Sequence, residues 1–180
     1  YSRDGNPMII TTPQTEKDFE QIYELNYNTF VEEIPQHEER EEKKLVDKFH
    51  HKNKYLVAKK EDKVVGMVCY NSVRPFSLDQ KLEDLDSYLP KDSIVVEVRL
   101  LAVSKSERNG TVMYRLVKHL TKHLYTLGFN VAIISGTTRE LELYSKMGFV
   151  PFGPLVGNGE AQFQPMYVTL QEIKKDLITD

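Results

Sequence analysis

Hydrophobic and polar residues alternate with two different periods along the chain, and each change of period marks an expected element. Alternating or continuous apolar runs predict strands over residues 8–12, 55–58, 64–70, 94–103, 131–135 and 162–169. Apolar residues spaced three and four positions apart predict helices over residues 15–31, 111–127 and 139–146. Two further helices are expected over residues 38–50 and 171–178. Strands that alternate with helices predict a mixed α/β (α+β) sheet.

Residues at the ends of these segments support the helix assignments. Thr15 and Asp18 have the spacing of a capping box, with Asp in place of the usual Glu. The helix that begins at Thr111 has the most regular apolar stripe, and Gly128 ends it. Residues 71–91 include two prolines and are expected to be irregular, apart from one short leucine-rich helix.

Length and composition are those of one globular domain. The chain has 180 residues, of which 40 % are hydrophobic and 28 % charged. We expect one domain over residues 8–180, with residues 1–7 a cloning remnant or a disordered start. The net charge of -3 argues against a nucleic-acid-binding protein, and no apolar run is long enough to span a membrane. The lone cysteine, Cys69, predicts a reducing, cytoplasmic location and a buried, inert thiol.

The strand over residues 94–103 carries two charged residues, Glu97 and Arg99, on one face. Two charges in so apolar a strand cost several kcal/mol unless they are paired or have a function. One interpretation is a structural Glu–Arg pair within the sheet. The other makes Glu97 a base, acting directly or through water. The residues alone leave both interpretations open.

A polar loop, residues 104–110, leads into the helix that starts at Thr111. Free backbone N–H groups at a helix N-terminus, together with the helix dipole, form an anion site suited to a pyrophosphate. Arg108 would add a charge-assisted contact. The alternative is an ordinary loop with a solvated arginine.

Two motifs in this region resemble those of the GNAT acyltransferases. The segment from Val103 to Met113, followed by an amphipathic helix, resembles the family's motif A, and Leu143-Tyr144-Ser-Lys-Met-Gly148-Phe149 resembles its second signature. The resemblance covers residues 55–169. It implies a GNAT-like fold with a central splayed sheet flanked by helices. It also implies transfer of an acetyl or longer acyl group, other than an amino-acyl group, from acyl-CoA to a primary amine of a small molecule.

The resemblance assigns roles to individual residues. Tyr144 would be the general acid that protonates the leaving thiolate, although it could instead be a packed aromatic. Glu97 would be the base. The acyl donor would be held by the following residues: Leu101, Ala102, Val103, Arg108, Asn109, Gly110, Thr111, Val112, Met113 and Thr137. No metal is implied, and a homodimer is compatible with the sequence.

The chain departs from motif A in a way that resembles one subgroup. Thr111 and Met113 stand where the family has glycines, which let the backbone approach the diphosphate of coenzyme A. Acyl-homoserine-lactone synthases and N-acyl amino acid synthases often lack these glycines and take acyl chains from acyl carrier protein. Glu97-Val-Arg99 approximates their Glu-x-x-Arg motif, and Asn26 stands where they have an arginine. Acyl-ACP is therefore the alternative donor, and an inactive acyl-CoA-sensing module is the alternative to an enzyme.

Overall fold

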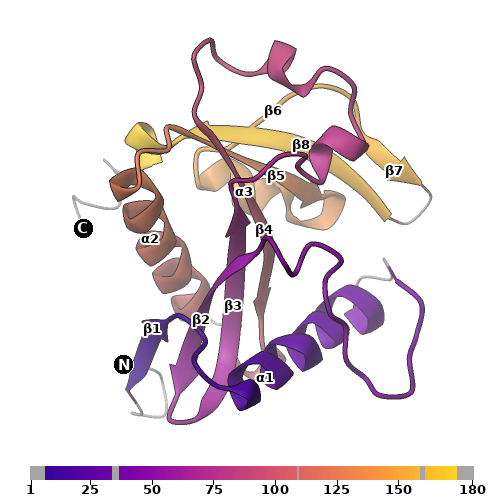
Figure 1. Ribbon diagram of the computed structural model, residues 1–180, viewed down its shortest axis with the longest axis vertical. Helices are drawn as coiled ribbons and strands as arrows, with labels where there is room; N and C mark the ends of the chain where they lie inside the picture. Colours follow the sequence, from indigo (N-terminus) through magenta and orange to yellow (C-terminus); the bar gives the residue numbers. More distant parts are fainter. Residues whose placement is uncertain (1–6, 34–36, 109, 159–160, 174–180) are drawn as a thin grey trace. The chain divides into compact units, whose positions relative to one another are not determined.

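The computed structural model describes residues 7–33, 37–108, 110–158 and 161–173, and the chain is drawn in Figure 1. The chain divides into two units. The first comprises the described residues of Tyr1–Tyr70 together with Leu100–Leu120, and the second comprises those of Asn71–Arg99 and Thr121–Asp180. The single domain expected over residues 8–180 stays a prediction. Residues 1–6, most of the expected N-terminal remnant, lie outside the described residues.

Three antiparallel strands form the sheet of the first unit: β1 (Met8–Thr11), β2 (Lys54–Lys60) and β3 (Lys63–Asn71). The hairpin of β2 and β3 closes where Lys60 pairs with Lys63. β3 is followed in the sheet by β4 (Val95–Val103), which starts in the second unit and ends in the first. The predicted strands of this half are all present.

Helix α1 (Glu16–Tyr27) begins with the predicted capping box. The Asp18 nitrogen donates to the Thr15 hydroxyl at 3.2 Å, and the Thr15 nitrogen donates to the Asp18 carboxylate at 3.3 Å. The Asp18 carboxylate also pairs with Lys59 of β2 at 2.8 Å. The helix predicted over residues 15–31 continues past α1, but as a π-helical segment, η1 (Asn28–Glu33).

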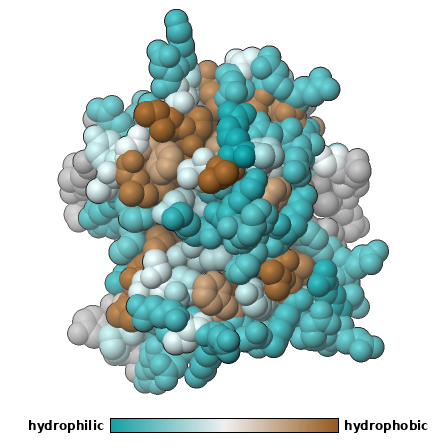
Figure 2. Space-filling model, viewed as in Figure 1, coloured by the Kyte–Doolittle hydropathy of each residue, from teal (hydrophilic) through white to brown (hydrophobic). Residues whose placement is uncertain are grey.

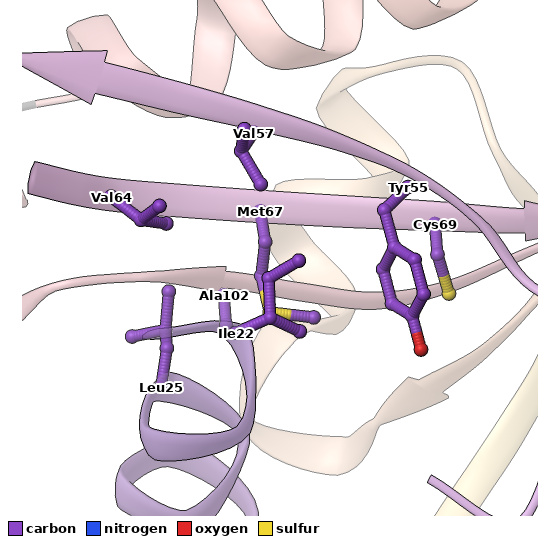
Figure 3. Close-up of a cluster of buried hydrophobic side chains, with 8 residues drawn as sticks. All are labelled: Ile22, Leu25, Tyr55, Val57, Val64, Met67, Cys69 and Ala102. Atoms are coloured by element: carbon purple, nitrogen blue, oxygen red, sulfur yellow. The ribbon is translucent and has the colours of Figure 1, made fainter. Parts of the chain in front are cut away.

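The core of the first unit lies between α1 and the sheet (Figure 3). Ile22 of α1 belongs to one buried cluster with Met67 of β3 and Ala102 of β4. Cys69 lies in the same cluster and is buried, as predicted. Because Ala102 is part of this core, the packing of α1 holds the end of β4, which carries three of the residues predicted to hold the acyl donor.

Helix α2 (Thr111–Thr126) approaches the sheet closely at Gly66 of β3. A Cβ atom at Gly66 would lie 2.7 Å from Cγ1 of Val112 and 3.0 Å from Cδ1 of Leu116. Glycine permits this contact between β3 and the first turns of α2 without a shift of the Val112 side chain or of the helix. The first turn of α2 is therefore held against the sheet of its own unit.

The helix predicted over residues 38–50 is not formed, and this prediction is wrong. The segment runs as turns and irregular chain, with Lys43 at a φ of 54°. Its backbone bonds to α1 instead. The Leu45 nitrogen donates to the Tyr23 carbonyl at 3.0 Å, and the Arg40 nitrogen donates to the Tyr27 hydroxyl at 2.9 Å. The many charges leave too little apolar surface for a packed helix, so these contacts determine the path.

The second unit continues the sheet through β5 (Val131–Thr137), β8 (Ala161–Thr169) and β6 (Val150–Pro151), with β7 (Val156–Asn158) also paired to β8. A 3-10 turn, η5 (Thr138–Glu140), and helix α3 (Leu141–Lys146) follow β5. The strand order β1-β2-β3-β4-β5-β8-β6 confirms the mixed α/β sheet. The short strands β6 and β7 were not predicted. Of the predicted terminal helix, residues 171–173 are helical and the rest lies outside the described residues.

The loop over residues 72–91 forms part of the core of the second unit. It contains two 3-10 turns, η2 (Leu78–Gln80) and η3 (Leu85–Tyr88), in place of the short helix that was expected. Its apolar side chains join those of β5 and β7 in one cluster, which consists of Phe76, Leu78, Leu82, Leu85, Val131, Ile133, Phe152 and Val156. The loop thus contributes buried side chains to the same core as these strands.

The visible surface is mixed in character. On the face shown in Figure 2, hydrophobic patches are separated by hydrophilic side chains. In the part of the chain that the structure describes, no helix is long and apolar enough to cross a bilayer. The same residues contain no group of three or more His, Cys, Asp or Glu side chains arranged to hold a metal ion.

Candidate active site

The parallel pairing of β4 with β5 is short. The described ladder runs from the pair Val95–Val131 to the pair Glu97–Ile133 and ends there. Further along β4, Leu100 has a φ of 58°, which interrupts the regular strand. A ladder that ends within the length of both strands leaves backbone N–H and C=O groups to be satisfied in other ways. Binding of the acyl donor at Leu101, Ala102 and Val103 of β4 stays a prediction.

The start of α2 has the local geometry of an anion site. Gly110 has a φ of 93°, and its carbonyl accepts the first helical hydrogen bond, from the Tyr114 nitrogen, at 3.0 Å. Thr111, Val112 and Met113 form the turn ahead of that bond, where a helix does not use its own N–H groups. The Val112 side chain is buried, so this residue could contact a ligand only through its backbone. Asn109 lies outside the described residues.

Arg108 lies beside this turn, but its guanidinium is already occupied. One terminal nitrogen donates to Glu33 Oε1 at 2.6 Å, and Nε donates to the Val103 carbonyl at 3.0 Å. The Glu33 side chain is 12 % exposed and the Arg108 side chain 40 % exposed. The cation predicted to meet a donor phosphate is therefore neutralised by a carboxylate from the end of η1.

A second ion pair lies in the same loop. Lys60, at the end of β2, donates to both carboxylate oxygens of Glu107 at 2.7 Å. The Lys60 side chain is 8 % exposed. Since both partners are largely removed from water, the pair anchors the loop before α2 to the sheet.

The second signature has a clear structural basis in the second unit. Gly148, at a φ of 99°, ends α3, and the Phe149 nitrogen donates to the Tyr144 carbonyl at 3.0 Å. This is the bond of a glycine-terminated helix that turns the chain back on itself. It brings the Phe149 ring edge-on to the Tyr144 ring, with centroids 5.9 Å apart. Gly148 and Phe149 therefore fix the orientation of Tyr144.

The environment of Tyr144 keeps its hydroxyl protonated. Burial raises the pKa of the Tyr144 phenol, and the charge and hydrogen bond of Glu140 raise this pKa further. The ring also lies close to β5, because a Cβ atom at Gly136 would be 3.2 Å from Cδ2 of Tyr144. A phenol held in this way stays protonated at neutral pH, with its single proton donated to Glu140.

Thr137, predicted to contact the donor, lies at the end of β5. Its hydroxyl oxygen and that of Ser135 are both buried, and within the described structure neither has a hydrogen-bond partner. The two residues share one face of β5 because strand side chains alternate. Buried hydroxyls without partners are unusual, so this pair is a candidate for binding a polar group.

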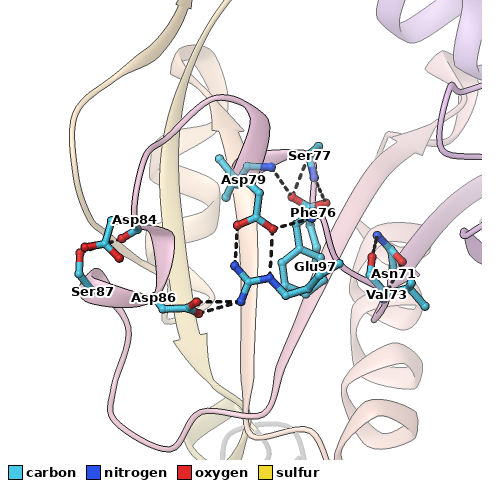
Figure 4. Close-up of polar contacts among 11 residues, drawn as sticks. Asn71, Val73, Phe76, Ser77, Asp79, Asp84, Asp86, Ser87 and Glu97 are labelled. Carbon is cyan, nitrogen blue, oxygen red and sulfur yellow. Dashed lines mark hydrogen bonds and ion pairs between the residues drawn. The ribbon is translucent and has the colours of Figure 1, made fainter.

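Glu97 lies in the second unit and is only 1 % exposed. Figure 4 shows its carboxylate beside Ser77 of the packed loop. The Ser77 nitrogen donates to Oε1 at 2.9 Å, the Ser77 hydroxyl to Oε2 at 2.7 Å, and the Leu78 nitrogen to Oε2 at 3.2 Å. The Arg99 guanidinium is 3.8 Å from Oε1. This arrangement ties the loop to β4, and it favours the structural interpretation of Glu97. The role of base stays a prediction.

The predicted site residues are thus divided between the units. The first unit holds the loop and first turn of α2, together with residues 101–103 of β4, and the second holds Tyr144, Glu97 and Thr137. Sequence reasoning missed Glu33 and Ser77. Both are common residue types far along the chain from their partners, and no local pattern marks them.

Comparison with known proteins agrees with this geometry. The model of the acetyltransferase (GNAT) family matches residues 19–149, which is more than half of the chain. The chain belongs to the GNAT family. This GNAT protein is an acyltransferase with the mixed fold that its motifs implied. A search of curated protein sequences found no match.

Solved structures share this GNAT fold. A CoA-dependent acyl-homoserine lactone synthase, BjaI, is 21% identical with a TM-score of 0.78, covering 96% of this chain and 89% of its own. FeeM, an N-acyl amino acid synthase from uncultured soil microbes, is 12% identical with a TM-score of 0.74, covering 94% of each chain. A putative N-acetyltransferase from Lactobacillus plantarum is 16% identical with a TM-score of 0.66, covering 92% and 99%. At these identities the likeness shows the shared fold.

Proposed function

We propose that this GNAT acyltransferase moves an acyl group from a pantetheine thioester, such as acyl-CoA, to a primary amine of a small molecule. The observation that carries the proposal is the oriented, protonated phenol of Tyr144, in a chain that belongs to this family. Acyl transfer from a thioester needs a donor for the leaving sulfur and no protein nucleophile, because the amine itself attacks. We place the enzyme in the cytoplasm, and a homodimer is compatible with this function.

The reaction balances with the groups at hand. The neutral amine attacks the carbonyl carbon, a C–N bond forms and the C–S bond breaks. The amine loses one proton and the sulfur gains one. An unperturbed thiol has a pKa of about 8.5, so the thiolate is a moderate leaving group that one hydrogen-bond donor can assist. Tyr144 would exchange its hydrogen bond to Glu140 for one to the developing thiolate, and its proton passes to the sulfur as the sulfur–carbon bond breaks. The phenolate that is left takes up a proton from water, because its raised pKa makes it the stronger base.

The proton lost by the amine needs an acceptor. Glu97 is the residue that the sequence proposes for this role, acting through water. Its oxygens, however, already accept hydrogen bonds from Ser77 and Leu78. We therefore assign Glu97 the task of holding the loop over residues 72–91, and propose that water takes the proton directly.

Three hypotheses for this site differ in the acyl donor or in whether acyl transfer occurs. Acyl-CoA use is favoured by the neighbour described as CoA-dependent. Acyl carrier protein is favoured by the side chains of Thr111 and Met113 at the first turn of α2. A module that binds acyl-CoA without turnover is the third reading, and Tyr144 would then have no catalytic task.

The proposal is tested by product analysis. The protein is incubated with isotope-labelled acyl-CoA, or with acyl carrier protein loaded with the same acyl group, and with a library of primary amines. Mass spectrometry should then detect a labelled amide in one or more reactions, in an amount that grows with enzyme concentration. If labelled donor binds but no amide forms with any amine, the sensing module replaces the enzyme as the best reading.

A further inference from the structure

Two carboxylates neutralise the cations around the loop that precedes α2. Glu33 binds the Arg108 guanidinium at 2.6 Å, and Glu107 binds Lys60 at 2.7 Å. The four side chains together carry no net charge. A loop of this kind gains much of its attraction for phosphate from uncompensated arginine and lysine side chains.

The two ion pairs differ in where they lie. The pair of Lys60 and Glu107 is largely buried and belongs to the packing of the loop. Arg108 is the more accessible cation, with 40 % of its side chain exposed, and it reaches back to the Val103 carbonyl beside the turn of α2. Glu33 therefore stands next to the position that a donor phosphate would take if Arg108 bound it.

Thioester donors differ in charge at this position. Coenzyme A carries a diphosphate and a ribose phosphate, whereas phosphopantetheine on a carrier protein carries one phosphodiester. A carboxylate next to the phosphate site repels the more highly charged donor more strongly. Thr111 and Met113 also disfavour coenzyme A, since their side chains hinder close approach of a diphosphate to the backbone of the first turn.

We propose that Glu33 is a specificity-determining residue that lowers the affinity of the enzyme for coenzyme A, and so favours a carrier-bound phosphopantetheine donor. The inference rests on the proposed function, because it assumes that a pantetheine thioester binds at this loop. It adds to that function the donor class and a residue that selects it.

The test measures binding, so it does not need the acceptor amine. Dissociation constants of coenzyme A and of acyl-pantetheine, which has no phosphate, are measured by calorimetry for the wild type and the Glu33→Gln variant. Glu33→Gln should lower the dissociation constant of coenzyme A by roughly tenfold at low salt, and by less at high salt. The dissociation constant of acyl-pantetheine should stay unchanged. Glu32→Gln is the matched control, because Glu32 is an exposed neighbour that pairs weakly with Lys43 at 4.0 Å.

A double variant shows whether the effect acts through Arg108. In an Arg108→Gln background, Glu33→Gln should strengthen coenzyme A binding by a smaller factor than in the wild type, because only the direct repulsion between Glu33 and the phosphates is then relieved. The inference is overturned if Glu33→Gln and Glu32→Gln change coenzyme A binding equally, or if Glu33→Gln leaves it unchanged. Failure of the wild type to bind acyl-pantetheine and acylated carrier protein would instead contradict the proposed function. Thermal unfolding of each variant confirms that the fold is retained.

Discussion

Ser77 donates two hydrogen bonds to the buried carboxylate of Glu97, from its backbone nitrogen at 2.9 Å and from its hydroxyl at 2.7 Å. A residue of an irregular loop thus completes the hydrogen bonding of a charge inside a strand. Since a buried carboxylate without partners costs several kcal/mol, the loop over residues 72–91 and β4 stabilise each other.

The Ser77→Ala variant removes the hydroxyl donor and should lower the free energy of unfolding by about 1–3 kcal/mol, because the carboxylate of Glu97 loses a partner in a dry environment. Urea denaturation measures this difference. Ser87→Ala is the control from the same loop, since the Ser87 hydroxyl is exposed and donates only to the Asp84 carbonyl. Equal stability of the two variants would contradict the structural role of Ser77.

The Glu97→Gln variant separates the two interpretations of Glu97. If Glu97 holds the loop, one oxygen becomes an amide nitrogen that faces donors, and the free energy of unfolding should fall by about 1–3 kcal/mol. A base role predicts a different result, a loss of turnover of about 10²- to 10⁴-fold with stability retained. Measuring unfolding and turnover on the same preparation decides between them, and we expect the first outcome.

Asp18 should make the stability of the protein depend on pH. Its pKa is lowered by the hydrogen bond from Lys59 first, and also by that from the Gln14 backbone. The ionised form is thus favoured in the folded state, and its stabilisation is complete above the unfolded pKa of about 3.9 and lost as pH falls through the lower folded pKa. Asp18→Asn should lower the free energy of unfolding by about 1 kcal/mol at pH 7, and this difference should vanish in strong acid.

The measurement for Asp18 is urea unfolding of the wild type and the variant at pH 7 and at about pH 2, below the range in which carboxylates usually ionise. Glu16→Gln is the control, because Glu16 is an exposed acid in the same first turn. A cost for Asp18→Asn that persists unchanged in acid would show that the ionised carboxylate is not the stabilising form.

A larger residue at Gly66 should destabilise the protein. In Gly66→Ala the new Cβ atom would lie 2.7 Å from Cγ1 of Val112, so the Val112 side chain or the first turn of α2 must shift, and stability should fall by about 1–3 kcal/mol. If the turn shifts, donor binding should weaken in parallel. Thermal unfolding and calorimetry measure the two effects, and an unchanged melting temperature would contradict the close contact.

The elements with regular apolar spacing could be predicted from the sequence. α2 is an example, because Leu116, Leu120 and Leu124 recur on one face and are all buried. Residues 38–50 could not be predicted, since hydrogen bonds from Leu45 and Arg40 to distant residues of α1 set their path. A local hydrophobic pattern predicts an element only where the same residues are buried in the folded chain.

Only part of the candidate site could be predicted from the sequence. The Tyr144 signature is local, because Gly148 and Phe149 directly follow the short helix that carries the tyrosine and contact it. The partner of Arg108 is not local. Glu33 lies 75 positions away, and a glutamate near the end of an amphipathic helix reads as a solvated surface residue.

The central claim is that Tyr144 serves a leaving thiolate, and release of free thiol tests it most directly. With a donor and amine that react, the wild type should release thiol steadily, and Tyr144→Phe should release it about 10²- to 10⁴-fold more slowly with donor affinity retained. Since the pKa of Tyr144 is raised above its ordinary value of about 10, no loss of rate from its ionisation should occur below that pH. Thiol release at the wild-type rate by Tyr144→Phe would contradict the account.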